Sequence, residues 1–199
     1  MSFTLERFTG RDIMAVTAQL AALRVAVFRE FPYLYEGTPE YEARYVQPYL
    51  TSPHSLAVIV RHGDKVIGAS TALPLVDEAA EVQRPFLEQG YDPDTVFYLA
   101  ESVLLPAYRG RGLGVRFFEE RERHARTLGS FRFTTFCAVD RPADHPRRPR
   151  SYTPLDEFWR KRGYVPKPEL ATHFSWRDLG ETGETAKPMT FWLKELESS

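Results

Sequence analysis

The most informative part of this sequence for the fold is one continuous stretch of strand and turn residues, Phe97-Tyr-Leu-Ala-Glu-Ser-Val-Leu-Leu-Pro-Ala-Tyr-Arg-Gly-Arg-Gly-Leu-Gly114. Its first part lies within Thr95–Leu105, which is almost continuously apolar and predicts a central strand covered on both faces. Pro106 ends the strand, and three glycines then alternate with other residues directly before a helix. Small residues let a ligand approach the backbone, and the first amides of a helix point outward without partners. The stretch therefore predicts an anion site suited to phosphate.

Arginines add positive charge to this turn. Residues 107–126 carry six Arg against three Glu, a local net charge of +3 in a chain whose net charge is −1. The dinucleotide fingerprint would need glycine at position 115, where Val115 stands, and the Gly-Lys-Ser/Thr ending of a nucleotide-triphosphate loop is absent. The spacing is instead Arg-x-x-Gly-x-Gly, over residues 109–114.

The hydrophobic pattern on both sides of this stretch predicts a mixed α/β chain. Helices are predicted over Ile13–Phe28, after Pro39, over 77–90, after the glycine turn and over Leu155–Arg162; strands are predicted over Phe3–Phe8, Leu56–Val60, Lys65–Leu73, Phe131–Val139, Leu170–Trp176 and Met189–Leu196. Residues 140–150 are too rich in proline for either element and form a loop. No linker interrupts this order. Residues 1–199 are therefore predicted to be one domain with a central, mixed and mostly antiparallel sheet and helices on both faces.

The composition excludes several classes of protein. The 199 residues are 43% hydrophobic and 27% charged, as in a soluble globular domain, and no run of about 18 apolar residues could span a membrane. A net charge of −1 gives no general attraction to nucleic acid or to a membrane surface. Cys137 is the only cysteine, and the five histidines show no metal-ligand spacing. Together with a first segment that lacks a signal-peptide core, this predicts a cytoplasmic protein without metal.

The chain resembles the GNAT N-acetyltransferase superfamily. The spacing Arg109-Gly-Arg-Gly112-Leu-Gly114, the strand ending in Leu-Leu-Pro106, and the segment Phe158-Trp-Arg-Lys-Arg-Gly-Tyr164 carry the resemblance. The order of elements extends it from about Phe3 to Leu196. The resemblance implies that an acyl group, usually acetyl, moves from acetyl-CoA to a small-molecule amine or a protein amino group by direct attack.

The resemblance also implies how acetyl-CoA is held. The glycine turn would bind its pyrophosphate and the strand backbone its pantetheine arm. The residues concerned are Val103, Leu104, Leu105, Arg109, Gly110, Arg111, Gly112, Leu113 and Gly114. In this superfamily the strand splays from its neighbour here, so the amide of Leu104 or Leu105 is expected to face the thioester oxygen and to stabilise its developing charge.

Glu101 is the expected general base for the attacking amine. It is the only charged side chain between Thr95 and Leu105, and burial in an apolar strand raises the pKa of a carboxyl group. The alternative is that Glu101 lies on the sheet surface or pairs structurally with an arginine.

The expected general acid departs from the family pattern. Trp159 stands where family members often carry a tyrosine, and an indole has no acidic proton to give. Tyr152, one to two turns earlier, is the replacement candidate, with simple packing as its alternative role. A thiolate is also a stable leaving group, with a thiol pKa of about 8.5, so a dedicated acid can be unnecessary.

The segment Phe31-Pro-Tyr-Leu-Tyr-Glu36 is predicted to overhang the acceptor site. Tyr33, Tyr35 and Glu36 can hold a cationic amine through ring faces and a carboxylate, or the tyrosines can simply fill the core. The arginine-rich loop 140–150 either grips an anion or is a solvated loop. Cys137 is predicted to be a buried, inert thiol.

Two other functions stay open. A non-catalytic acyl-CoA sensor or interaction module on the same fold is favoured by the missing tyrosine at position 159. An RNA binder that uses the loop 140–150 is disfavoured by the near-neutral chain. Edge strands of such sheets often pair between subunits, so a homodimer is open as well.

Overall fold

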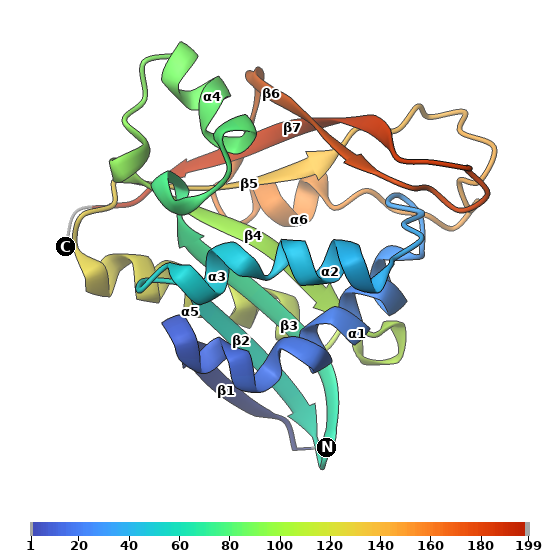
Figure 1. Cartoon of the computed structure of the whole chain (residues 1–199), viewed down its shortest axis with the longest axis horizontal. Helices are drawn as coiled ribbons and strands as arrows, with labels where there is room; N and C mark the ends of the chain where they lie inside the picture. The colour runs from blue at the N-terminus through green and yellow to red at the C-terminus, as the bar shows by residue number, and fades with distance from the viewer. Residues whose placement is uncertain (1, 198–199) are drawn as a thin grey trace.

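Seven strands form one sheet in the computed structural model, which describes residues 2–197 (Figure 1). They are β1 (Thr4–Thr9), β2 (Leu56–His62), β3 (Lys65–Pro74), β4 (Val96–Leu104), β5 (Phe133–Val139), β6 (Val165–Trp176) and β7 (Thr185–Glu195). Their order is β1-β2-β3-β4-β5-β7-β6. Every neighbouring pair is antiparallel except β4 and β5, which are parallel. The predicted mixed, mostly antiparallel sheet is confirmed.

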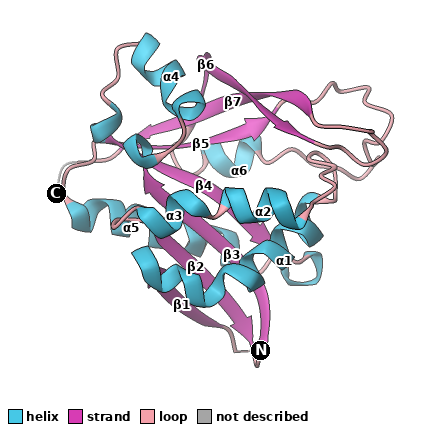
Figure 2. Cartoon of the chain, viewed as in Figure 1, coloured by secondary structure: helices cyan, strands magenta, loops and turns pink. Residues whose placement is uncertain are grey.

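Helices cover both faces of this sheet (Figure 2). One face carries α1 (Thr17–Phe28), α2 (Pro39–Tyr45) and α3 (Gln47–Thr51), and the other carries α5 (Leu113–Leu128) and α6 (Asp156–Arg160), while α4 (Ala80–Glu88) packs against β6. Separate apolar clusters lie on the two faces, with Leu20 and Tyr49 in one and Phe97 and Phe118 in the other. None of the helices within residues 2–197 is long and apolar enough to cross a bilayer.

The largest differences from the sequence prediction lie at three element boundaries. The first four residues of the predicted helix Ile13–Phe28 belong to a 3-10 helix, Gly10–Val16, that precedes α1. Strand β6 begins at Val165 instead of Leu170, and β7 begins at Thr185 instead of Met189. The added part of β6 contains proline at 166 and 168, which is tolerated because β6 lies at the edge of the sheet, where missing N–H groups do little harm.

A β-bulge in β4 sets the direction of Glu101. Thr71 pairs with Glu101 and Leu73 pairs with Tyr98, so β4 advances by three residues over the span in which β3 advances by two. Without the extra residue, alternation from Tyr98 would turn the Glu101 side chain toward α5. With it, Glu101 reaches Arg24 on α1, on the opposite face.

Beyond the bulge, β4 and β5 separate. Their parallel pairing covers Val96–Tyr98 against Phe133–Thr135 and then stops, while β5 stays paired with β7 as far as Val139. The second half of β4 therefore keeps β3 on one side and has an open side toward β5. This opening joins the two faces of the sheet at Glu101.

Candidate active site

The glycine turn forms one end of a long groove with a volume of about 1270 Å³. Gly110 and Gly112 have φ of 74° and 78°, the left-handed region that glycine adopts without strain. The amides of Val115 and Arg116 both donate to the Gly112 carbonyl, at 3.1 and 3.2 Å. The amides up to Gly114 thus precede the first hydrogen bond inside α5 and lie at its positive end. The predicted anion site has the backbone geometry that it needs.

Gly114 has a packing role that the sequence did not indicate. A Cβ atom there would lie 3.3 Å from Cζ of Phe158, which belongs to α6. The absence of a side chain lets α6 close against the start of α5, and Phe158 becomes part of the groove wall.

The amides of the second half of β4 divide between two directions. The Leu105 amide donates to the Ile67 carbonyl at 2.9 Å, so this pair is a hydrogen-bonded pair of the antiparallel ladder. Because such pairs alternate, Leu104 and Ser102 direct their amides away from β3, toward the open side. The expectation for Leu105 is thereby corrected, because its amide is bound within the sheet, whereas Leu104 stays a candidate donor and Ser102 joins it.

Glu101 belongs to a buried cluster of charges. The Arg24 guanidinium donates from Nη1 to Glu101 Oε2 and, over 2.7 Å, from Nε to Glu42 Oε2. Tyr35 donates its hydroxyl proton to Glu42 Oε1 at 2.7 Å. Arg24, Glu42 and Glu101 are all less than a tenth exposed. The structural arginine pair, one of the two predicted roles of Glu101, is therefore present.

Burial controls the protonation equilibria of this cluster. Burial raises the pKa of Glu101 above its ordinary value, although Arg24 opposes the shift. Burial would lower the pKa of Arg24, but Glu101, Tyr45 and Glu42 outweigh it and raise that pKa well above its ordinary value. Arg24 is therefore a permanent cation, and the two carboxylates leave the ionised cluster with a net charge of −1.

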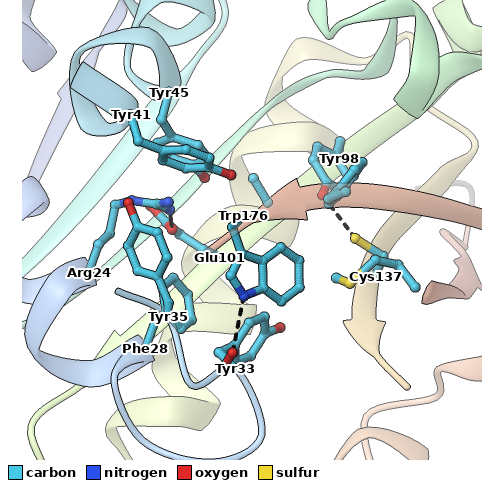
Figure 3. A pocket seen from close by; sticks show the side chains of 13 residues that line it. Arg24, Phe28, Tyr33, Tyr35, Tyr41, Tyr45, Tyr98, Glu101, Cys137 and Trp176 are labelled. Carbon is cyan, nitrogen blue, oxygen red and sulfur yellow. Dashed lines mark hydrogen bonds and ion pairs between the residues drawn. The ribbon is translucent and has the colours of Figure 1, made fainter. Parts of the chain in front are cut away.

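A small aromatic cavity of about 90 Å³ lies next to this cluster (Figure 3). Arg24 and Glu101 are its charged lining residues, and Arg24 places its guanidinium 3.3 Å from the centre of the Tyr45 ring. The remaining lining residues are Phe28, Tyr33, Tyr35, Tyr41, Tyr45, Tyr98, Ala100, Cys137, Phe174, Trp176 and Met189. Glu101 is one of the residues that line both this cavity and the groove, so it lies where the two hollows meet.

Arg121 of α5 holds the bulge from the other face. Its Nη1 donates to the carbonyl oxygens of Glu101 at 3.0 Å and of Thr71 at 3.4 Å, the residue pair that borders the bulge. The side chain is 1% exposed, and burial lowers the pKa of Arg121 to about 10. One buried cation thus ties α5 to both strands at the position from which Glu101 projects.

A sequence model described as "Acetyltransferase (GNAT) family" matches residues 20–148 of the chain. The chain belongs to the GNAT acetyltransferase family. The resemblance seen in the glycine turn is thus confirmed, although a comparison with curated protein sequences gave no match.

Solved structures of acetyltransferases are similar in fold to this GNAT chain. An acetyltransferase of the GNAT family from Streptococcus pneumoniae has 15% sequence identity and a TM-score of 0.59 over 98% of this chain and 100% of its own. The yncA protein of Salmonella typhimurium, solved with its cofactor acetyl-CoA, has 12% identity and a TM-score of 0.59 over 100% and 96%. Ribosomal-protein-alanine N-acetyltransferase from Brucella melitensis has 13% identity and a TM-score of 0.60 over 97% and 99%.

The structure brings together part of the predicted acceptor site of this GNAT protein. Tyr33 and Tyr35 line the aromatic cavity. Glu36 does not, because it turns toward Arg177 and pairs with it at 3.5 Å. Cys137 is buried beside Tyr98, at 3.2 Å from its hydroxyl, and burial raises the pKa of its thiol to about 12. Its predicted burial is confirmed, and its inertness stays a prediction.

Tyr152, the predicted general acid, and Trp159, which stands where family members often carry a tyrosine, both line the groove. Tyr152 packs edge-on against Phe31 with 4.7 Å between ring centres, and Arg148 covers its ring at 4.8 Å. Trp159 packs against Trp192 at 5.0 Å. Tyr152 therefore lies on the loop that forms one wall of the groove, and its role as an acid stays a prediction.

Several site residues escaped the sequence analysis. Arg24 and Glu42 are charged residues at buried positions of α1 and α2. The hydrophobic periodicity of these helices could have identified them, because it places both residues on the apolar face. Arg141, from the supposedly solvated loop, is largely buried, with Asp178 at 2.8 Å and the Pro32 carbonyl at 2.8 Å. This arginine fastens the Phe31–Glu36 segment to the β6–β7 hairpin. Within residues 2–197, no three His, Cys, Asp or Glu side chains form a metal-binding group.

Proposed function

We propose that the protein is an N-acetyltransferase that moves the acetyl group of acetyl-CoA to a primary amine, with Glu101 as the general base. One observation carries this proposal: Glu101 stands where the groove of the glycine turn meets the aromatic cavity. A donor in the groove and an amine in the cavity would meet at this carboxylate. The single, buried Cys137 supports the cytoplasmic location expected from the sequence.

The residues present fit acetyl-CoA, which the Salmonella typhimurium relative holds. The amides up to Gly114 and the positive end of α5 suit the pyrophosphate. The amide of Leu104 suits the pantetheine arm. The amide of Ser102 follows Glu101 directly, so we assign it to the thioester oxygen, where a fixed donor stabilises developing negative charge.

Glu101 has one oxygen for each of two tasks. Oε2 binds Arg24, which fixes the carboxylate, and Oε1 makes a long contact of 3.5 Å with the Thr71 hydroxyl. Oε1 is the proposed acceptor of the proton. An alkyl ammonium has a pKa of about 10.4, so the amine must lose a proton before its nitrogen can attack. The nitrogen then bonds to the acetyl carbon, the carbon–sulfur bond breaks, and CoA leaves as a thiolate. The second proton that the nitrogen loses on becoming an amide passes to the solvent.

Tyr152 is the proposed donor to the leaving thiolate. It lines the groove, and burial raises the pKa of its hydroxyl, so the proton is present at neutral pH. Because a thiolate leaves readily, Tyr152→Phe is expected to lower kcat far less than a change at Glu101.

Glu101→Gln tests the function directly. The amide keeps the shape and an oxygen for Arg24 but takes up no proton, so kcat should fall about 100-fold or more while acetyl-CoA binding stays within about twofold. Glu42→Gln is the matched control, because it removes a charge from the same cluster without lining the cavity, and its kcat should fall far less. Thiol release with a panel of amines gives kcat, and calorimetry gives the affinity for acetyl-CoA.

The same measurements separate the second candidate, a non-catalytic acyl-CoA sensor. The Arg24–Glu101 pair favours that candidate, because a carboxylate held by a cation is a weaker base. Tight binding of acetyl-CoA with no thiol release for any amine would establish the sensor and reject the enzyme.

A further inference from the structure

We propose that the acceptor is a short aliphatic monoamine, with an apolar body of about four carbons, that enters the aromatic cavity and places its nitrogen at Glu101. This proposal rests on the N-acetyltransferase function above and narrows it to one class of amine. The size, the charge and the lining of the cavity carry it.

The size of the cavity favours a small apolar body over an aromatic ring. Its volume is about 90 Å³. A protein cavity of about 150 Å³ is known to take benzene, so this smaller space suits a body of about four carbons. Its walls include Tyr98, Trp176 and Met189, which are 5%, 4% and 3% exposed. Closely packed walls of this kind resist expansion.

The charge of the cavity selects a monocation. Glu101 and Arg24 line it, and Glu42 binds Arg24 from outside it, so the ionised cluster carries one net negative charge. Burial raises the pKa of all five lining tyrosines, which therefore stay neutral: Tyr33, Tyr35, Tyr41, Tyr45 and Tyr98. One ammonium group neutralises the cluster. A diamine would leave a buried positive charge, and an alcohol would leave the negative charge uncompensated.

The lining also fixes which end of the amine enters first. Arg24 already lies over Tyr45 at 3.3 Å and near Phe28 at 5.3 Å, so its guanidinium occupies these ring faces and keeps a second cation away from them. The residues that line both hollows are Phe28, Tyr33, Ala100, Glu101 and Cys137. Met189, like Tyr98 and Trp176, lines the cavity but not the groove. The ammonium group therefore belongs at the junction with the groove, and the apolar body belongs toward Met189.

Three amines of defined size and charge test the proposal: 1-aminobutane, 2-phenylethylamine and 1,4-diaminobutane. Binding is measured as the rise in the midpoint of thermal unfolding, and turnover as thiol release from acetyl-CoA. We expect 1-aminobutane to bind at least about tenfold more tightly than the other two, with a similar ratio in kcat/KM. Equal or tighter binding of either competitor would overturn the proposal.

The two readouts separate this proposal from the enzyme function. Selective binding of 1-aminobutane without turnover would keep the acceptor class and reject the N-acetyltransferase. Turnover of larger or doubly charged amines in preference to 1-aminobutane would keep the enzyme and reject the acceptor class.

Met189→Ala sharpens the test, because it enlarges the cavity at a residue that does not line the groove. We expect kcat/KM for 2-phenylethylamine relative to 1-aminobutane to rise at least about tenfold. Leu170→Ala is the matched control, since Leu170 is fully buried in the same core but lines neither hollow, and its ratio should stay at the wild-type value. An unchanged ratio in Met189→Ala would contradict the size argument, and the wild-type panel decides the proposal even if this variant does not fold.

Discussion

The groove and the aromatic cavity meet at one carboxylate but are built from different material. The groove measures about 1270 Å³ and offers backbone amides at its glycine turn and along β4. The cavity measures about 90 Å³ and consists of side chains from helices and strands that lie far apart in the chain. A site of backbone groups survives most side-chain substitutions. A site of side chains can change its ligand with a single substitution, so we expect the cavity to determine which acceptor this protein takes.

Among the changes that distinguish the cavity from the groove, removing Arg24 should have the largest effect on stability. Arg24→Met leaves Glu101 and Glu42 buried without their shared cation, which should destabilise the fold by about 3–5 kcal/mol. Arg44→Met is the control, because the exposed Arg44–Glu184 pair should contribute less than about 1 kcal/mol. Denaturant unfolding measures both variants. A loss below about 1 kcal/mol in Arg24→Met would show that the cluster does not hold the cavity together.

The difference between a groove built from backbone groups and a cavity built from side chains also explains which features the sequence could predict. The glycine turn is local: Gly110, Gly112 and the start of α5 follow one another, so their geometry follows from spacing. The bulge is not local, because it depends on how β4 pairs with β3, and it alone turns Glu101 toward Arg24. The cavity joins α1, α2 and β4–β7, and no sequence period links residues so far apart. Glu36 was misplaced for this reason, since its neighbour in the sequence, Tyr35, does enter the cavity.

Arg121 tests whether the bulge connects the two hollows. Arg121→Met removes the donor to the Glu101 and Thr71 carbonyls, which should cost about 1–3 kcal/mol and let the Glu101 carboxylate move. We expect kcat to fall about tenfold while the affinity for acetyl-CoA stays near the wild-type value. Arg123→Met, at an exposed arginine on the same helix, should change neither. An unchanged kcat in Arg121→Met would show that β4 keeps its bulge without help from α5.

Gly112→Ala should affect the groove alone. An alanine at φ 78° strains the backbone by about 1–2 kcal/mol and disturbs the amides at the start of α5. Gly63→Ala is a matched control, because Gly63 also has a positive φ, 59°, with open space around its Cα, but lies in the β2–β3 turn. Both variants should lose similar stability, while calorimetry should show weaker acetyl-CoA binding for Gly112→Ala only. Equal affinities would remove the turn from the binding site.

The smallest expected effect comes from Glu78. Its carboxylate accepts a hydrogen bond from the Ala79 amide, whereas that of Glu101 accepts one from Arg24. Burial raises the pKa of Glu78 from 4.5 to about 7. A pKa raised on folding stabilises the folded state fully below the unfolded pKa, and this contribution is lost as the pH rises through about 7. Glu78→Gln should therefore gain about 1 kcal/mol relative to wild type between pH 5 and pH 8, less than the full shift implies because the side chain is partly exposed. Denaturant unfolding at both pH values measures the difference. A pH-independent difference would mean that the pKa of Glu78 is the same in the folded and unfolded states, so that burial without an arginine does not favour the neutral carboxyl at this position.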